Sequence, residues 1–187
     1  DFTEGIRLKP GQAFAHMQRG IAFHRIGDAD NALTDYTIAH ELTPKDPNPL
    51  VNRGIVYYTK KGKFEEAVAD FDQALKLNPK EVNALINRGV TWRQRNDPDR
   101  AIVDFTEAVR LGLQTSDILK LTQKDKNDKT DPATSQTADQ VANAYYQRGM
   151  ALIDKQEYEA AVKDFEAAID INEKEPRAYL GRGAAYL

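Results

Sequence analysis

The sequence predicts an all-α fold, a solenoid built from stacked helix pairs. One observation is a glycine that recurs after 34 and then 35 residues, as Gly20, Gly54 and Gly89. A second is that an alanine follows each of these glycines after 12 or 13 residues, and an acidic-aromatic pair follows each alanine. A fixed period near 34 residues is typical of helix-turn-helix arrays, which usually function through a surface rather than a pocket.

The repeats divide the chain into segments with definite boundaries. Residues 1–12 match the end of a repeat's second helix, because Asp1–Pro10 aligns without gaps on Asp70–Pro79. We therefore expect the sequence to be cut from a longer array at both ends, although a natural chain that starts here is the alternative. The predicted repeats are residues 13–46, 47–81, 82–115 and 142–175, and residues 176–187 form the first helix of a fifth.

Residues 116–141 are predicted to be an insertion between the third and fourth repeats. The stretch 123–136 is polar and lacks helical periodicity, so it is expected to be a loop, which is either functional or a tolerated surface insertion. The residues from Thr137 to Gln140 are typical of a capping box that opens an extended first helix. The acidic residues from Asp125 onward lack the glycine and the final glutamate of a calcium loop.

The recurring glycines need a steric reason, because a glycine inside a helix costs about 1 kcal/mol relative to alanine. We expect the second helix of each pair to approach the glycine with its own alanine. The turn between the paired helices holds Gly27, Gly62 or Asn96, which suit a left-handed residue, whereas Gln156 suits that place less well. The alanines expected at the crossings are Ala32, Ala67, Ala101 and Ala161.

These recurring positions resemble the tetratricopeptide repeat family over nearly the whole chain, in a form similar to bacterial members. The resemblance implies a right-handed stack of antiparallel helix pairs whose first helices line a concave face that holds peptides or partner proteins. The family's carboxylate clamp does not transfer, because its basic positions hold Met17, Val51, Asn83 and Asn87. The matching small residues are Gly20, Ala32 and Ala39; Gly54, Ala67 and Ala74; Gly89, Ala101 and Ala108; and Gly149, Ala161 and Ala168.

An arginine precedes each recurring glycine, and an aspartate precedes each second-helix aromatic residue. Because both partners are present in every repeat, we predict half-buried ion pairs that join the two helices; the alternative is a row of solvated arginines. These arginines are predicted to be structural rather than ligand-binding. The expected pairs are Arg19 with Asp35, Arg53 with Asp70, Arg88 with Asp104, and Arg148 with Asp164.

A row of carboxamides is predicted on the concave face, at the sixth position of each first helix. Neighbouring helices pack about 10 Å apart, and an extended peptide advances about 3.3 Å per residue, so one amide would meet about every third residue. A carboxamide offers both a donor and an acceptor to a peptide backbone. Plain polar surface is the alternative interpretation. The candidates are Gln18, Asn52, Asn87 and Gln147, flanked by Asn48, Asn83 and Asn143 and by Ile21, Ile55, Val90 and Met150.

Composition narrows the function further. The formal net charge of -3 disfavours a nucleic-acid groove, no apolar run could span a membrane, and the chain has no cysteine. Neither a catalytic constellation nor metal-ligand spacing is present, so we expect no enzyme activity, cofactor or metal site. The leading hypothesis is a protein- or peptide-binding scaffold. A regulatory arm of an enzyme, or a structural subunit that forms a homo-oligomer through its stack ends, remains open, as do cytoplasm and periplasm.

Overall fold

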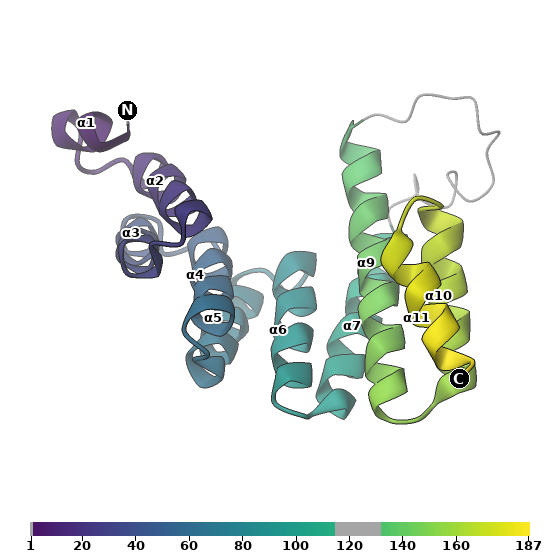
Figure 1. The fold of residues 1–187 in the computed structure, drawn as a ribbon. Helices are drawn as coiled ribbons and strands as arrows, with labels where there is room; N and C mark the ends of the chain where they lie inside the picture. Colours follow the sequence, from purple (N-terminus) through teal and green to yellow (C-terminus); the bar gives the residue numbers. More distant parts are fainter. Residues whose placement is uncertain (1, 115–131) are drawn as a thin grey trace. The chain divides into compact units, whose positions relative to one another are not determined.

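A computed structural model describes residues 2–114 and 132–187, with side chains of the second range described from Gln136 onward. All ten regular elements in these two ranges are α-helices, and within each range consecutive helices are joined by short turns (Figure 1). The predicted all-α array of helix pairs is therefore confirmed. The chain divides into two compact units, residues 1–87 and residues 88–187.

The first unit consists of two complete helix pairs and parts of two more. The helix α1 (Phe2–Leu8) packs against α2 (Ala13–Ile26), which forms a hairpin with α3 (Ala29–Leu42). The second hairpin consists of α4 (Asn48–Lys60) and α5 (Phe64–Leu77). The beginning of α6 (Val82–Gln94) covers this hairpin, because Ala84 joins Leu50 and Phe71 in one buried cluster.

The second unit begins within α6 and continues through α7 (Pro98–Leu113). The next described helix, α9 (Pro132–Asp154), packs on α7 and forms a hairpin with α10 (Tyr158–Ile171). The last helix, α11 (Pro176–Ala185), packs on α10. The hydrophobic core of the second unit contains a cluster around Leu152, Ala161 and Phe165.

One predicted boundary is wrong. The insertion was expected to cover residues 116–141 and the extended helix to open at Thr137, but α9 already begins at Pro132. Proline suits the first turn of a helix, and the alanines and glutamines that follow it are compatible with helix. The part of the predicted loop from residue 115 to residue 131 lies outside the described residues.

The turns within the hairpins have the predicted backbone conformation. Gly27 and Gly62 adopt positive φ angles of 86° and 62°, and Asn96 and Gln156 adopt 57° and 63°. A left-handed residue at this place ends the first helix and reverses the chain. Glycine adopts this conformation without strain, whereas the side chain of Gln156 makes it unfavourable.

The recurring glycines have a different steric partner from the one predicted. A methyl group built on Gly54 would lie 2.7 Å from the ring of Phe71, and one on Gly20 would lie 2.7 Å from the ring of Tyr36. The second-helix alanines are fully buried, but the aromatic ring four residues further along is what excludes a side chain at the glycine. The same contact recurs at Gly89 with Phe105 and at Gly149 with Phe165.

Candidate functional site

Each predicted Arg–Asp pair is formed as a bidentate ion pair between the two helices of one hairpin. In the second hairpin, Arg53 donates from Nε and Nη2 to the two carboxylate oxygens of Asp70 at 2.8 and 2.7 Å. The aspartates are buried, and the arginine side chains are between 18% and 24% exposed. The same geometry joins Arg19 to Asp35, Arg88 to Asp104, and Arg148 to Asp164, at 2.6–2.9 Å.

Two of these arginines also reach the preceding hairpin, which the sequence analysis missed. Arg53 donates from Nη1 to the hydroxyl of Thr37 at 3.0 Å, so it links α4 to both α5 and α3. In the second unit, Arg148 donates to the hydroxyl of Thr106 at 3.2 Å. In both cases the sequence signal is a threonine two residues after the ion-paired aspartate of the preceding hairpin. Thr37 follows Asp35, and Thr106 follows Asp104. The guanidinium groups therefore bind neighbouring hairpins together as well as the helices within one hairpin.

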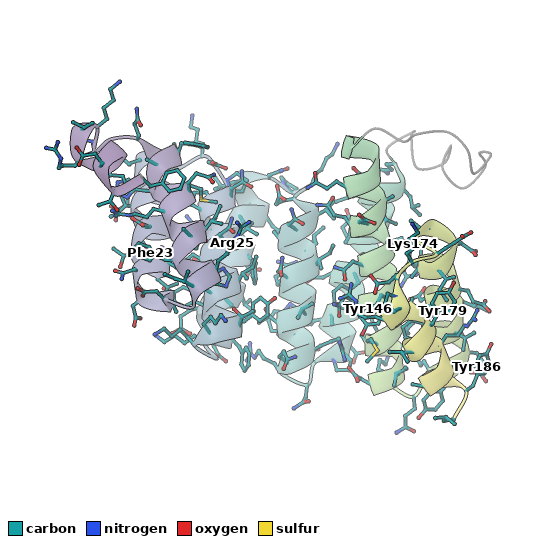
Figure 2. The ribbon with its side chains drawn as sticks, turned by 45° about the horizontal axis from the view of Figure 1, so that its top comes forward. Phe23, Arg25, Tyr146, Lys174, Tyr179 and Tyr186 are labelled. Carbon is teal, nitrogen blue, oxygen red and sulfur yellow. The ribbon has the colours of Figure 1, made fainter. Side chains whose placement is uncertain are left out.

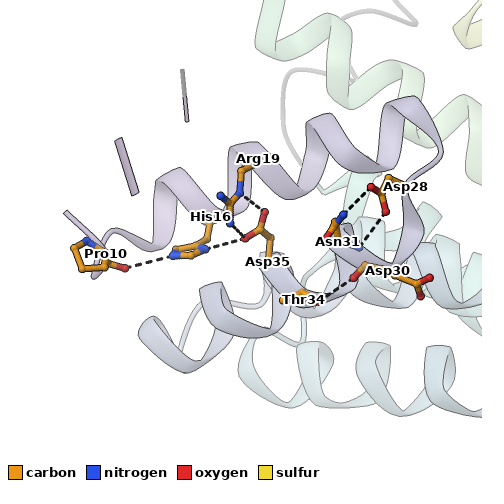
Figure 3. A network of polar contacts seen from close by, with 8 residues as sticks. All are labelled: Pro10, His16, Arg19, Asp28, Asp30, Asn31, Thr34 and Asp35. Atoms are coloured by element: carbon orange, nitrogen blue, oxygen red, sulfur yellow. Dashed lines mark hydrogen bonds and ion pairs between the residues drawn. The ribbon is translucent and has the colours of Figure 1, made fainter. Parts of the chain in front are cut away.

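The pair in the first hairpin is part of a larger polar network (Figure 3). His16 lies with Nδ1 2.9 Å from a carboxylate oxygen of Asp35 and with Nε2 3.3 Å from the carbonyl oxygen of Pro10. Burial alone would raise the pKa of Asp35, but hydrogen bonds from Arg19 and His16 outweigh it and hold that pKa below its ordinary value.

The first-helix face of the first unit, formed by α2, α4 and the part of α6 up to Asn87, holds three of the four predicted carboxamides. Gln18, Asn52 and Asn87 are half-buried on these helices. Asn52 donates from Nδ2 to the carbonyl oxygen of Asn48 at 3.0 Å, and Asn87 donates to that of Asn83 at 2.7 Å. The carboxamides of α4 and α6 are thus held in the same way, each by a carbonyl one turn earlier in its own helix.

Further contacts restrict the side chains around this row. The hydroxyl of Tyr58 donates to the Oδ1 of Asn87 at 3.2 Å, which ties α4 to α6. Asn48 donates from its side chain to Asp46 at 2.8 Å. Ile21 and Ile55 are partly buried and pack on the clusters of their own hairpins, so only the accessible part of each side chain could contact a ligand.

The remaining predicted site residues lie in the second unit. Asn143 and Gln147 are half-buried on α9, and Val90 is half-buried on α6. Met150 packs against the cluster that contains Phe165. Tyr146, which Figure 2 labels, lies one position before Gln147 and has the guanidinium of Arg177 5.1 Å from its ring centre. At the position before the carboxamide, where the second unit has Tyr146, the first unit has Met17, Val51 and Ile86.

A polar hollow of about 550 Å³ lies among the turns of the second unit, lined by Arg93, Gln94, Asn96, Pro98 and Asp154, and Arg93 is already paired with Asp154 at 2.7 Å. Within residues 2–114 and 132–187, no three His, Asp or Glu side chains are grouped so that they could hold a metal ion. No helix in these ranges is long and apolar enough to cross a membrane.

Comparisons with known proteins agree on the repeat. Two family models described as tetratricopeptide repeat match the chain, one at residues 56–112 and the other at residues 142–175. A search of curated protein sequences found no match. The two matched segments contain three of the four predicted Arg–Asp pairs in whole or in part.

Solved structures share the fold at low sequence identity. PilF from Pseudomonas aeruginosa matches 92% of this chain and 67% of its own, with 16% identity and a TM-score of 0.75. MamA from Desulfovibrio magneticus RS-1 matches 92% of this chain and 82% of its own, with 21% identity and a TM-score of 0.68. The first tetratricopeptide domain of Spaghetti (RPAP3), bound to the HSP90 peptide SRMEEVD, matches 76% of this chain and 91% of its own, with 20% identity and a TM-score of 0.59.

Proposed function

Because this chain is a tetratricopeptide repeat protein, we propose that it is a protein-interaction scaffold whose first-helix face in residues 1–87 binds an extended segment of a partner protein. The fold supports a binding role, and one structural neighbour holds a peptide. Within this chain, the supporting features are the polar side chains that repeat from one first helix to the next.

The observation that carries the proposal is the shared anchoring of Asn52 and Asn87. In each case one N–H of the carboxamide is used by the helix's own carbonyl, which fixes the orientation of the group. An asparagine carboxamide has a second N–H and an oxygen with two acceptor sites, and Asn87 uses one of these acceptor sites for the hydroxyl of Tyr58. A fixed group of this kind can exchange hydrogen bonds with a peptide backbone at a reduced cost in side-chain entropy.

The spacing of helices suits an extended ligand. Packed helices lie about 8–10 Å apart, and an extended chain advances about 3.3 Å per residue, so a segment of about seven residues spans the three first helices. Backbone recognition by amides would select for extended conformation more than for particular side chains. The partly accessible Ile21 and Ile55 would supply apolar contacts beside the amides.

A selection from displayed random peptides of about 12 residues tests the proposal, with the chain of residues 1–187 as target. We expect enriched peptides to bind the double variant Asn52→Ala/Asn87→Ala at least about tenfold more weakly, since each lost hydrogen bond is worth about 0.5–1.5 kcal/mol. The control is Gln73→Ala, which removes an exposed carboxamide from the second helix α5. Equal binding to the double variant and the wild type would show that the ligand lies elsewhere.

A further inference from the structure

Charge is segregated between the two kinds of helix in residues 1–87. The helices α2 and α4, and α6 up to Asn87, contain no aspartate or glutamate at all. The helices α3 and α5, by contrast, are rich in carboxylates. These are Asp30, Asp35, Glu41, Glu65, Glu66, Asp70 and Asp72. The first-helix face therefore receives only positive charge from the helices that form it.

Two of the four cations on these helices are neutralised by ion pairs, and two are not. Arg19 and Arg53 are bound by Asp35 and Asp70. Arg25, near the end of α2, and Lys60, the last residue of α4, are exposed, and no carboxylate of the described residues lies within ion-pair distance of either. The lysines that follow in the turn differ from them, because Lys61 pairs with Asp30 and Lys63 with Glu66.

The carboxyl-terminal ends of α2 and α4 lie near each other, because Lys61, which follows Lys60, pairs at 2.7 Å with Asp30 in the first turn of α3, directly after the turn that ends α2. His24 is next to Arg25 on α2; burial lowers the pKa of His24, and the positive charge of Lys60 on α4 lowers it further. We name Arg25 and Lys60 the basic edge; Figure 2 labels Arg25 on α2. Cations gathered without counter-charges raise the local potential and attract anionic groups.

We propose that the segment bound by the first-helix face is acidic and that its carboxylates lie against Arg25 and Lys60 of the basic edge. This inference rests on the proposed function and names the partner's chemistry. A neutral segment would leave both cations without partners, and a basic one would be repelled. The basic edge is separate from the clamp positions, which hold Met17, Val51, Asn83 and Asn87. A nucleic acid is disfavoured, because phosphate backbones are bound by larger numbers of cations.

The same peptide selection tests this inference when its products are read by charge. Peptides enriched on the wild-type chain at low ionic strength should contain an excess of Asp and Glu over Lys and Arg relative to the unselected library. The reversal Arg25→Glu/Lys60→Glu should abolish that excess. The matched control is Lys45→Glu/Lys80→Glu, which makes the same change in net charge at exposed lysines that follow α3 and α5.

Affinity gives a second readout. The most enriched acidic peptide should bind the Arg25→Glu/Lys60→Glu variant about three- to thirtyfold more weakly than the control, since exposed charge pairs contribute about 0.2–1 kcal/mol each and the reversal adds repulsion. Added salt should weaken binding to the wild type.

The outcomes separate this inference from the function on which it rests. Enriched peptides without an acidic excess, or an excess that survives the reversal of Arg25 and Lys60, would overturn the inference and leave the scaffold function standing. A selection that enriches no peptide would overturn the proposed function, and the inference with it. Circular dichroism of each variant checks that both substitution pairs leave the helices folded.

Discussion

The first hairpin, α2–α3, and the second, α4–α5, have the same framework with different polar content. Both have an arginine bound by an aspartate through two hydrogen bonds, and both have a glycine against an aromatic ring. At the fourth position of the first helix, however, His16 in one hairpin corresponds to Leu50 in the other. At the aromatic position of the second helix, Tyr36 corresponds to Phe71.

The two polar residues that distinguish the first hairpin, His16 and Tyr36, differ in whether their polar atoms have hydrogen-bond partners. His16 is buried and lies within hydrogen-bond distance of Asp35 and Pro10. Tyr36 is fully buried, and its hydroxyl has no hydrogen-bond partner among the described residues. Burial raises the pKa of Tyr36 to about 12, and the Asp35 carboxylate adds to this. The framework therefore tolerates a polar atom in its core, but the cost depends on whether a partner is present.

The largest effects should come from removing the buried aspartates. Asp35→Ala and Asp70→Ala should each lower the free energy of unfolding by about 3–5 kcal/mol, because each leaves an arginine without its buried partner. Asp35→Ala should cost more, since it also removes the contact to His16. Urea titrations followed by circular dichroism measure both losses.

The control for the aspartates is Asp30→Ala. The Asp30 side chain is 84% exposed and pairs with Lys61, so its loss should change the free energy of unfolding by less than about 1 kcal/mol. If Asp35→Ala cost no more than Asp30→Ala, the buried pairs would not hold the hairpins together. If Asp70→Ala cost more than Asp35→Ala, the contact to His16 would add no stability.

The next largest effect, a loss of stability when the recurring glycine is replaced by alanine, should be equal in the two hairpins. Gly20→Ala and Gly54→Ala should each destabilise the chain by about 1–3 kcal/mol, because the new methyl group would overlap the ring of Tyr36 or Phe71. Gly183→Ala is the matched control, because nothing lies within 4 Å of a methyl group there, and it should stabilise α11 by up to about 1 kcal/mol. Thermal melts distinguish the signs, and a destabilised Gly183→Ala variant would contradict the ring-contact explanation.

Exchanging the aromatic residues of the two hairpins should change the free energy of unfolding in opposite directions. Tyr36→Phe should raise the free energy of unfolding by about 1 kcal/mol, because it removes a buried hydroxyl that lacks a partner. Phe71→Tyr should lower it by about 1–3 kcal/mol, because it places such a hydroxyl in the second hairpin. Urea midpoints of the two variants and the wild type are sufficient. A destabilising Tyr36→Phe would mean that the hydroxyl makes a favourable interaction.

The smallest predicted effect is the loss of the stability contributed by Asp35 at low pH. Because the pKa of Asp35 is lowered in the folded state, this group stabilises the fold above its unfolded pKa, near 3.8, and the contribution is lost as the pH falls through the folded pKa. The difference in stability between the wild type and Asp35→Asn should therefore be constant above about pH 5 and shrink below about pH 4. Urea midpoints from pH 6 to pH 3 test this, and a gap that widened in acid would reverse the assignment.

Much of the fold could be predicted because its determinants recur in the sequence. The Arg–Asp pairs were predictable, since an arginine and an aspartate occupy the same two places in four repeats. The steric partner of the glycines was not, because Ala32 and Tyr36 recur with equal regularity and only coordinates show that the ring is nearer. The start of α9 was missed because residues 132–136 contain no large apolar side chain, and such a stretch is compatible with a loop as much as with an exposed helix.

The candidate site was less predictable than the fold. Spacing placed Gln18, Asn52 and Asn87 on successive first helices, but it did not reveal that Asn52 and Asn87 are anchored to their own helices or that Tyr58 binds Asn87. The contacts of His16 with Asp35 and Pro10 depend on side-chain orientation across two segments, so the repeat pattern does not indicate them. The contact of Arg53 with Thr37 likewise joins hairpins that the repeat pattern treats as independent.

The most direct test of the central claim is an NMR titration of the isotope-labelled chain with the most enriched peptide. The side-chain amide resonances of Gln18, Asn52 and Asn87 report on the first-helix face, and those of Asn31 and Gln73 report on the second helices. The first set should shift along one saturable curve with a single Kd while the second set stays unchanged. Shifts confined to Asn31 and Gln73 would contradict the claim that the first helices of residues 1–87 form the binding surface.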